Sequence, residues 1–421
     1  MSFEIISVIG LGYIGLPTAA MFASCKKKVI GVDVNQHAVD TINRGEIHIV
    51  EPDLDMLVHA AVTEGYLKAV LVPEPADAFL IAVPTPFKPC EEDAIPEPDL
   101  SYIESACKNI ASVLKKGDLV ILESTSPVGA TEQVAKWLAD ARPDLSFPQV
   151  AGDDADVNVA HCPERVLPGH IVRELVENDR VIGGMSARCS ERSVELYKIF
   201  VQGDCVITNA RTAEMAKLTE NSCRDVQIAF ANELSIICDK LDIDVWELIA
   251  LANRHPRINI LQPGPGVGGH CIAVDPWFIV SKTPEEAKLI HTARLVNDSK
   301  PEWVIDKVKL AIADYLQLNP TQTTKDVTVA CYGLAFKPDI DDLRESPALS
   351  ITKKIAEIHS GFIIAVEPNI QTLPISLTNV ELVSTKFANA EADIHVLLVD
   401  HVEFISTVKP NGIVIDTKGI W

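Results

Sequence analysis

The stretch IISVIGLGYIGLP, residues 5–17, decides the fold of the first part of the chain. A short apolar run, Ile5–Ile9, leads directly into the glycines of a G-x-G-x-x-G pattern, Gly10, Gly12 and Gly15. After a strand, the first glycine permits a tight turn, the second lets the backbone approach a pyrophosphate, and the third lets helix and strand pack closely. The helix start also offers unpaired N–H groups to an anion. The stretch therefore predicts a dinucleotide-binding turn.

An acidic residue about twenty positions further on identifies the expected dinucleotide. Asp33 ends the next apolar run, Val29–Val34. A carboxylate there accepts hydrogen bonds from the ribose hydroxyls of NAD and repels the 2′-phosphate of NADP. We therefore predict NAD as cofactor, with Tyr13 and Ile14 of the pattern also in contact with it. The alternative is that the glycines serve only a tight turn.

The remaining apolar runs predict the fold class. Strands that are apolar throughout are typical of parallel sheets covered by helices on both faces. The further runs of the first half are Phe79–Val83, Leu119–Glu123, Val157–His161 and Val181–Gly183. The same pattern restarts later, at Val327–Tyr332, Phe362–Val366, His395–Val399 and Ile413–Ile415, with a helix near 347–358. These two regions predict two Rossmann-like, doubly wound α/β domains with parallel sheets.

A helical region is expected between the two sheets. Residues 211–240 contain no Gly or Pro and predict one long helix, and a second helical stretch is expected from about 284 to 297. The resulting domains are 1–205 for the NAD-binding part, 206–305 for a central helical part, and 306–421 for a second, smaller α/β part.

Composition excludes several function classes. The net charge of −22 repels phosphate backbones, so nucleic-acid binding is not expected. None of the ten cysteines forms a C-x-x-C pair, so we expect no metal site, and scattered thiols fit a reducing cytoplasm. The first residues lack a basic region and no apolar run is long enough for a membrane span, so neither secretion nor membrane insertion is expected.

Two further strand ends carry hydroxyl side chains. Thr85 follows one apolar run in VPTP, and Thr125 and Ser126 follow another in ESTSP. Ligands bind at the carboxyl ends of strands in open α/β sheets, so these hydroxyls could reach the cofactor or the reacting carbon. The alternative is that the threonines cap helices.

Two patterns indicate chemistry only weakly by themselves. Cys271 follows a glycine pair and His270, where its thiol could have a depressed pKa and be nucleophilic, but ten cysteines make such proximity by chance common. Lys217, Asn221 and Arg224 share one face of the expected long helix, which could equally be a solvated face.

Eight motifs in order give these residues a context. They resemble the UDP-glucose/GDP-mannose dehydrogenase family over essentially the whole chain. The motifs are GLGYIGLP, VPTP, ESTSPVG, CPERVLPG, AEMAKLTENS, GPGVGGHCIAVDP, YGLAFKPDIDDLRESP and VEPN. The resemblance implies an oxidation of a nucleotide sugar from primary alcohol to carboxylate with two NAD per substrate. It also implies a thiohemiacetal and a thioester on Cys271, and the second oxidation is the step that requires a cysteine.

The resemblance implies roles for residues near the reacting carbon. Lys217 would stabilise an oxyanion or move its proton, and Asn221 would donate to the same oxygen. Asp275, four residues after Cys271, would lie one helical turn along if that segment is helical, and would handle the alcohol proton with Lys217. Glu164 would help hydrolyse the thioester, its alternative being a surface carboxylate, and Thr125 would lie near the reaction.

The resemblance also implies a local basic site in an acidic chain. Arg344 would reach the cofactor phosphates. Phe336, as a stacking or packing surface, and Lys337 would contact the nucleotide. The full set expected to bind substrate is Arg165, Val166, Lys217, Asn221, Arg224, His255, Arg257, Gly268, Phe336 and Lys337.

The choice of sugar rests on finer likeness. TENSCRDVQIAFANEL and LANRHPRINILQPGPGVGGHCIAVDP resemble the branch that oxidises UDP-N-acetyl-D-mannosamine for enterobacterial common antigen, and Ala273, where the family commonly has proline, agrees with that branch. UDP-glucose and UDP-N-acetylglucosamine remain alternative substrates. A two-electron β-hydroxyacid dehydrogenase and a non-catalytic nucleotide-sugar-binding protein are alternatives of other classes; Cys271 argues against both. Resemblance to the family also implies a homodimer.

Overall fold

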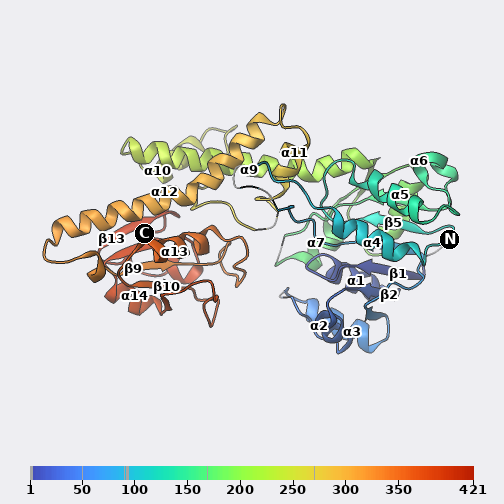
Figure 1. The fold of residues 1–421 in the computed structure, drawn as a ribbon, viewed down its shortest axis with the longest axis horizontal. Coiled ribbons are helices and arrows are strands. Elements are labelled where there is room, and N and C mark those ends of the chain that lie inside the picture. Colours follow the sequence, from blue (N-terminus) through green and yellow to red (C-terminus); the bar gives the residue numbers. More distant parts are fainter. Residues whose placement is uncertain (1–2, 50, 90, 92–93, 168, 270) are drawn as a thin grey trace. The chain divides into compact units, whose positions relative to one another are not determined.

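The chain folds into two compact units (Figure 1). The computed structural model describes residues 3–49, 51–89, 91, 94–167, 169–269 and 271–421. The first unit contains the chain up to residue 220 together with 277–282, and the second contains 221–276 and 283–421. Each unit is built around one sheet.

The first unit has an eight-stranded sheet in the order β3-β2-β1-β4-β5-β6-β7-β8. This is a doubly wound α/β arrangement, as the apolar runs predicted, because helices bury apolar side chains on both faces. One face packs on α1, α2, α3, α7 and α8 and the other on α4 and α5. The strands are β1 (Ile5–Ile9), β2 (Lys28–Val32), β3 (Leu67–Val70), β4 (Ala78–Ile81), β5 (Leu119–Leu122), β6 (Asn158–His161), β7 (Arg180–Gly184) and β8 (Cys205–Asn209). The helices are α1 (Gly15–Ser24), α2 (Gln36–Asn43), α3 (Leu54–Thr63), α4 (Ser101–Ala111), α5 (Ala130–Ala141), α6 (Pro148–Ala151), α7 (Ile171–Glu177) and α8 (Ala187–Tyr197).

The expectation of a wholly parallel first sheet was wrong at one strand pair. β7 runs antiparallel to β6, with Ala160 opposite Gly184, whereas every other pair in this sheet is parallel. An apolar run reveals that a strand is buried, but it does not reveal the direction of the strand. The patterns also missed β3 and β8, whose residues alternate with solvent or lie exposed, as Val206 and Ile207 do.

The long helix predicted between the sheets is α9 (Ala210–Lys240), which spans 31 residues. It is followed by α10 (Val245–Ala252), α11 (Asp275–Lys282) and α12 (Lys288–Leu318). α12 is much longer than the stretch expected to end near 297, and it continues through Pro301. Its residues Val304, Ile305 and Val308 are buried in the core against the second sheet, and this packing sustains the helix beyond the proline.

The second unit has a five-stranded sheet in the order β11-β10-β9-β12-β13, parallel throughout as predicted. Its strands are β9 (Val329–Tyr332), β10 (Ile363–Val366), β11 (Val380–Leu382), β12 (Ile394–Leu397) and β13 (Ile413–Asp416), and its shorter helices are α13 (Pro347–Ile358), α14 (Thr385–Glu391) and α15 (Val402–Ile405). Across the described part of the chain, no helix combines the length and apolarity that crossing a membrane requires.

Candidate functional site

The glycine loop lies between β1 and α1. Gly10 has φ +92°, and a Cβ there would come within 2.8 Å of the carbonyl oxygen of Ala82. A Cβ on Gly15 would lie 1.8 Å from the carbonyl oxygen of Gly10. Gly12 differs, because no atom lies within 4 Å of the position its Cβ would take. Gly10 and Gly15 therefore serve the turn itself, whereas the open space at Gly12 fits the close approach of a ligand.

The start of α1 and the end of β2 complete the cofactor end. The N-cap of α1 is Ile14, which makes no side-chain capping bond. Leu16 N–H donates to the carbonyl of Gly12 at 3.1 Å and Pro17 has no N–H, so Gly15 supplies the backbone N–H of this turn for an anion. Asp33 Oδ2 accepts a hydrogen bond from the N–H of Leu11 at 2.9 Å, and its Oδ1 accepts one from Asn35 at 2.9 Å. Each carboxylate oxygen can accept a second bond. These residues fit the phosphate and ribose of NAD.

The threonines at the next two strand ends do not cap helices, so that alternative was wrong. α4 and α5 have Leu100 and Gly129 at their N-caps. The Oγ1 of Thr85 is buried and has no hydrogen-bond partner among the described residues. A buried hydroxyl without a partner costs free energy, which suits a group that binds a ligand. Thr125 is half-buried in the loop after β5.

A buried carboxylate holds the loop after β5. Glu214, in the second turn of α9, accepts hydrogen bonds from the N–H of Gly129 at 2.7 Å and from the N–H and hydroxyl of Thr131 at 2.7 and 2.6 Å. Ser126, in the same loop, is buried and donates to a carbonyl oxygen two residues before it at 2.8 Å. Lys217 lies three residues after Glu214 on α9 and is half-buried. The start of α9 is thus fixed to the loop that carries Thr125.

Three buried charged side chains meet at the carboxyl edge of the first sheet. Because β7 is antiparallel to β6, its first residue, Arg180, lies at the edge where β5 and β6 end. Arg180 Nη1 donates to Glu164 Oε2 at 2.7 Å and lies 3.9 Å from Glu123 Oε1. The hydroxyl of Tyr197 donates to the same Glu123 oxygen at 3.1 Å. Burial, together with the nearby Glu164 carboxylate, raises the pKa of Glu123 to about 8.

Glu164 is not a surface carboxylate, which removes the alternative expected for it. Glu164 is only 6% exposed. Its Oε2 binds Arg180, and its Oε1 accepts a hydrogen bond from the N–H of Arg165 at 2.6 Å. The side chain of Arg165 pairs with Glu220, with Nη2···Oε1 at 2.7 Å, and also donates to the carbonyl of Asp179 at 3.2 Å. Val166, the next residue, packs against the core of the first unit. The CPERV segment is therefore fixed through side chains and backbone alike.

Cys271 begins a short helical turn, so the condition under which Asp275 lies one turn further along is met. The N–H of Asp275 donates to the carbonyl oxygen of Cys271 at 2.9 Å, and that of Val274 donates to the same oxygen at 3.1 Å. Asn221 Nδ2 donates to Asp275 Oδ2 at 2.5 Å. Cys271 is exposed, whereas Asp275 is buried. One turn thus connects the exposed thiol to the Asp275–Asn221 pair; His270 lies outside the described residues.

The expected polar face of α9 lies on one continuous helix. Lys217 and Asn221 are half-buried, and Arg224 is exposed. Its neighbour Asp225 is buried and accepts a hydrogen bond from Arg294 Nη1 of α12 at 2.6 Å. The side chains next to the Lys217–Asn221–Arg224 face therefore anchor the helix, and the face itself keeps part of its polar surface exposed.

The glycine pair before Cys271 packs directly on the second α/β region. A Cβ on Gly268 would lie 2.4 Å from the carbonyl oxygen of Glu345 and 3.0 Å from Phe336 Cβ. Gly269 has φ +82°, and a Cβ there would lie 3.1 Å from the ring of Phe336. Phe336 is therefore a packing surface for the loop that leads to Cys271.

The other basic residues lie on two loops of the second unit. His255 and Arg257 are exposed in a loop closed by Asn253, whose side chain accepts the N–H of Ile260 at 2.7 Å and donates to its carbonyl at 2.9 Å. Lys337 is half-buried in the loop after β9.

Arg344 is exposed on that same loop, and its guanidinium forms a fork with Asp342. Its Nη2···Oδ2 distance is 2.6 Å, and its Nε···Oδ1 distance is 2.8 Å. To bind the cofactor phosphates, Arg344 would have to give up its hydrogen bonds to Asp342.

Sequence patterns missed the buried charged residues that hold these loops. They include Glu123, Arg180, Glu214, Glu367 and His401. Glu123, Glu214 and Glu367 were inside quoted motifs, so their positions were visible. Their roles were not, because a hydrogen bond between distant segments leaves no local spacing pattern.

Comparisons with known proteins agree with the three-part organisation. The chain matches the NAD binding domain of the UDP-glucose/GDP-mannose dehydrogenase family over residues 4–201, the central domain over 211–299, and the UDP binding domain over 330–421.

Similar proteins extend over the whole chain. A UDP-N-acetyl-D-mannosamine dehydrogenase from Yersinia pestis is 67% identical over 426 residues, covering 100% of both chains. An NDP-N-acetyl-D-galactosaminuronic acid dehydrogenase from Ralstonia nicotianae is 62% identical, covering 100% of this chain and 97% of its own. The solved UDP-D-ManNAc dehydrogenase from Pyrococcus horikoshii is 37% identical with a TM-score of 0.86, covering 99% of this chain and 96% of its own.

These matches cover both sheets and the helices between them, and the glycine loop and Asp33 fit the cofactor that the first matched domain binds. The chain belongs to the UDP-glucose/GDP-mannose dehydrogenase family and is an NAD-dependent enzyme with a UDP-binding domain.

Proposed function

We propose that the protein oxidises UDP-N-acetyl-D-mannosamine to UDP-N-acetyl-D-mannosaminuronate. The single structural observation that carries the reaction type is the helical turn from Cys271 to Asp275, which joins an exposed cysteine to a pair formed by buried Asp275 and half-buried Asn221. The sugar is supported by the 67% identity to the Yersinia pestis dehydrogenase over its full length.

The proposed reaction removes two hydrides from one carbon. NAD held by the glycine loop and Asp33 would supply the acceptor for each hydride and would be exchanged between the two oxidations. The alcohol loses a hydride and a proton to give an aldehyde, and the Cys271 sulfur adds to that aldehyde as a thiohemiacetal. Loss of a second hydride and proton gives a thioester. Water then cleaves the thioester, which releases the carboxylate and returns the thiol.

The chain's own residues would handle the protons and the oxyanion. Lys217 and Asn221 donate to the oxygen on the reacting carbon. Asp275, whose Oδ2 already accepts from Asn221, takes part in the alcohol proton transfer with Lys217. Glu164, held by Arg180, activates the water that cleaves the thioester, and Thr125 orders the reactants.

The remaining basic residues would hold the two nucleotides. We propose that Arg165, Val166, Arg224, His255, Arg257, Gly268, Phe336 and Lys337 bind the UDP-sugar, and that Gly10, Gly12, Tyr13, Ile14, Gly15, Asp33, Thr85, Thr125, Ser126 and Arg344 bind NAD. The exposed fork of Arg344 with Asp342 would open when it engages phosphate. The domain boundaries proposed for these tasks are 1–205, 206–305 and 306–421, and each family match falls within one of them.

The decisive experiment counts NADH formed per nucleotide sugar. Purified protein is given limiting UDP-N-acetylmannosamine, UDP-N-acetylgalactosamine, UDP-N-acetylglucosamine or UDP-glucose with excess NAD. The proposal expects two NADH per UDP-N-acetylmannosamine and a higher kcat/KM for it than for the others. One NADH per sugar would exclude the thioester mechanism. Preference for the galactosamine sugar would instead support the second candidate, which the 62% identity to the Ralstonia nicotianae dehydrogenase favours.

The Cys271→Ser variant tests the covalent step. A serine hydroxyl can still add to an aldehyde, but it forms a poorer acyl intermediate. We expect release of the carboxylate to fall by at least about 10³-fold, while NAD binding is retained. Cys223→Ser is the matched control because Cys223 is also an exposed cysteine of the second unit. Acid formation at the wild-type rate in Cys271→Ser would contradict the mechanism.

We also propose a cytoplasmic homodimer that supplies a uronic acid for enterobacterial common antigen or a related polysaccharide. The dimer is supported by large apolar side chains exposed on and after α9, including Phe230 (51%), Ile237 (45%) and Leu241 (62%). Light scattering of the purified protein should give twice the chain mass, and Phe230→Glu with Ile237→Glu should shift it to one chain. A wild-type monomer would contradict the dimer without affecting the proposed reaction.

A further inference from the structure

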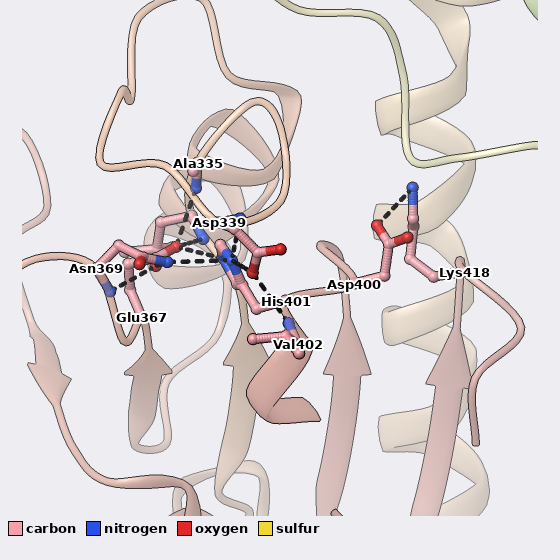
Figure 2. A network of polar contacts seen from close by, with 9 residues as sticks. Ala335, Asp339, Glu367, Asn369, Asp400, His401, Val402 and Lys418 are labelled. Carbon is pink, nitrogen blue, oxygen red and sulfur yellow. Dashed lines mark hydrogen bonds and ion pairs between the residues drawn. The ribbon is translucent and has the colours of Figure 1, made fainter. Parts of the chain in front are cut away.

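A buried network lies at the carboxyl edge of the five-stranded sheet (Figure 2). It joins the loops that follow β9, β10 and β12, which reach the same edge because the three strands are parallel neighbours. Its centre is Glu367, directly after β10, and His401, directly before α15; both side chains are fully buried. In open α/β sheets this edge is where ligands bind.

Glu367 accepts five hydrogen bonds. Oε2 accepts from the N–H of Leu334 at 2.7 Å, from the N–H of Ala335 at 3.1 Å and from His401 Nε2 at 3.0 Å. Oε1 accepts from the backbone and the side-chain amide of Asn369 at 3.1 and 3.2 Å. Burial alone would raise the pKa of Glu367, but the bonds from His401, Leu334 and Asn369 outweigh it and lower the pKa.

The hydrogen bonds of His401 define its tautomer. The N–H of Asp339 donates to His401 Nδ1 at 2.9 Å, and a backbone N–H can only donate. Nδ1 therefore carries a lone pair, and Nε2 carries the hydrogen that is donated to Glu367. Nδ1 therefore binds the loop after β9 directly, through Asp339, whereas Nε2 binds Glu367, which holds the start of that loop.

Asp339 is held in a conformation that it would otherwise avoid. Its φ is +61°, in the left-handed region. Its N–H is bound by His401, and its Oδ1 accepts the N–H of Val402 at 3.0 Å. Non-glycine residues keep such a conformation only where surrounding contacts enforce it, commonly at ligand-binding sites.

These bonds hold the loop on either side of three residues. Glu367 accepts from Leu334 and Ala335 before them, and His401 accepts from Asp339 after them; the three residues between are Phe336, Lys337 and Pro338. We propose that Glu367 and His401 are positioning residues that preorganise this loop for the uridine nucleotide. The inference rests on the proposed function in assigning Phe336 and Lys337 to the nucleotide end, and extends it to the buried pair that sets their geometry.

Three substitutions separate the hydrogen bonds of Glu367 from those of His401. Glu367→Gln keeps the shape but turns one acceptor oxygen into a donor, so it cannot serve both Oε1 and Oε2 partners. His401→Asn keeps an acceptor near the Nδ1 position for Asp339 but loses the donor to Glu367. His401→Gln keeps a donor near the Nε2 position but loses that acceptor. Glu381→Gln, an exposed residue on β11, makes the same change of charge as Glu367→Gln away from the network and is the matched control.

The test measures binding of UDP itself to the full-length protein by calorimetry, together with amide hydrogen exchange. We expect Glu367→Gln to weaken UDP binding by roughly tenfold or more, and each His401 variant by a smaller factor, with NAD affinity unchanged. In the same proteins without ligand, exchange should accelerate at residues 334–335 in Glu367→Gln and at residue 339 in His401→Gln. Glu381→Gln should match wild type.

The outcomes separate this inference from the proposed function. UDP affinity within about twofold of wild type in folded Glu367→Gln and both His401 variants would overturn it. An equal loss of NAD and UDP affinity would also overturn it, since that result indicates general destabilisation. If Glu367→Gln does not fold, the variants His401→Asn and His401→Gln still test the inference, because only His401→Gln should accelerate amide exchange at residue 339. Wild-type protein that binds no UDP would contradict the proposed substrate class instead.

Discussion

Glu123 and Glu367 occupy equivalent places in the two units, yet their pKa values shift in opposite directions. Each directly follows a buried parallel strand, β5 or β10, and their residues are 1% and 4% exposed. Glu367 accepts five hydrogen bonds and has a lowered pKa. Glu123 accepts from Tyr197, its Oε2 has no partner among the described residues, and its pKa is raised to about 8. The carboxylate that faces more hydrogen-bond donors is thus the one whose pKa is lowered.

The difference also separates two tasks. The Glu367 network is saturated, so it can fix a loop of defined shape. The Glu123 cluster shares Arg180 between two carboxylates, and Arg180 Nη2 and Glu123 Oε2 both lack partners among the described residues. These two atoms without hydrogen-bond partners lie in the same cluster as Glu164, the residue proposed to activate water. Four substitutions would break or sharpen this comparison.

Arg180→Met has the largest expected effect on stability. It leaves Glu164 without its buried counterion, and removing one partner of a buried ion pair costs about 3–5 kcal/mol. Chemical denaturation should report this loss. The matched control is Arg173→Met, which breaks an exposed pair with Glu177 that is worth about 0–1 kcal/mol. Equal effects of the two substitutions would show that Arg180 is not the centre of the cluster.

Glu367→Gln should destabilise the second unit by about 1–3 kcal/mol at neutral pH, because a donor replaces an acceptor in a saturated network. The folded pKa of Glu367 lies below its usual value of 4.5, so its contribution is present above that pH and is lost as the pH falls through the folded pKa. Unfolding curves of wild type between pH 7 and pH 3 should fall more steeply than those of Glu367→Gln. Parallel curves would contradict the lowered pKa.

Glu123→Gln should have an effect of the opposite sign: relative to wild type, it should gain stability as the pH rises from 5 to 8. The folded pKa of Glu123 is about 8 and its usual value is 4.5, so between these values the folded state keeps a proton that the unfolded state loses. Wild-type stability therefore falls over this range as pH rises, and glutamine removes the fall. The exposed Glu191→Gln on α8 is the control. A loss of stability at pH 8 in Glu123→Gln would show that the carboxylate is ionised and needed.

Gly12→Ala should have the smallest effect on stability, within about 0.5 kcal/mol, because no atom lies within 4 Å of its Cβ position. This substitution tests a position at the carboxyl edge of the first sheet where open space, and not a hydrogen-bond donor, is the feature that matters. A methyl group there would meet the pyrophosphate, so NAD affinity should fall by more than about tenfold while Tm stays constant. Unchanged NAD binding, measured by fluorescence titration, would contradict the role given to this glycine.

Local sequence patterns were sufficient to predict the doubly wound class of both sheets, the long helix α9 and the cofactor loop. Those features depend on short-range patterns: apolar runs, the absence of Gly and Pro over residues 211–240, and three glycines at fixed spacing. The sequence placed Asp275 one turn from Cys271 only on the condition that the segment is helical, and the structure shows that turn. The family resemblance added the candidate roles of Lys217, Asn221 and Glu164.

Only the tertiary structure decided how these residues are held. The direction of β7 brings Arg180 to Glu164, core packing extends α12 through Pro301, and Gly268 and Gly269 pack on Phe336 more than 60 residues later in the chain. Glu123 and Glu367 have the same sequence pattern, because each is a glutamate that directly follows an apolar run. Their pKa values diverge because the hydrogen-bond donors that face them come from segments far away in the chain, and neither composition nor spacing encodes which donors the fold will deliver.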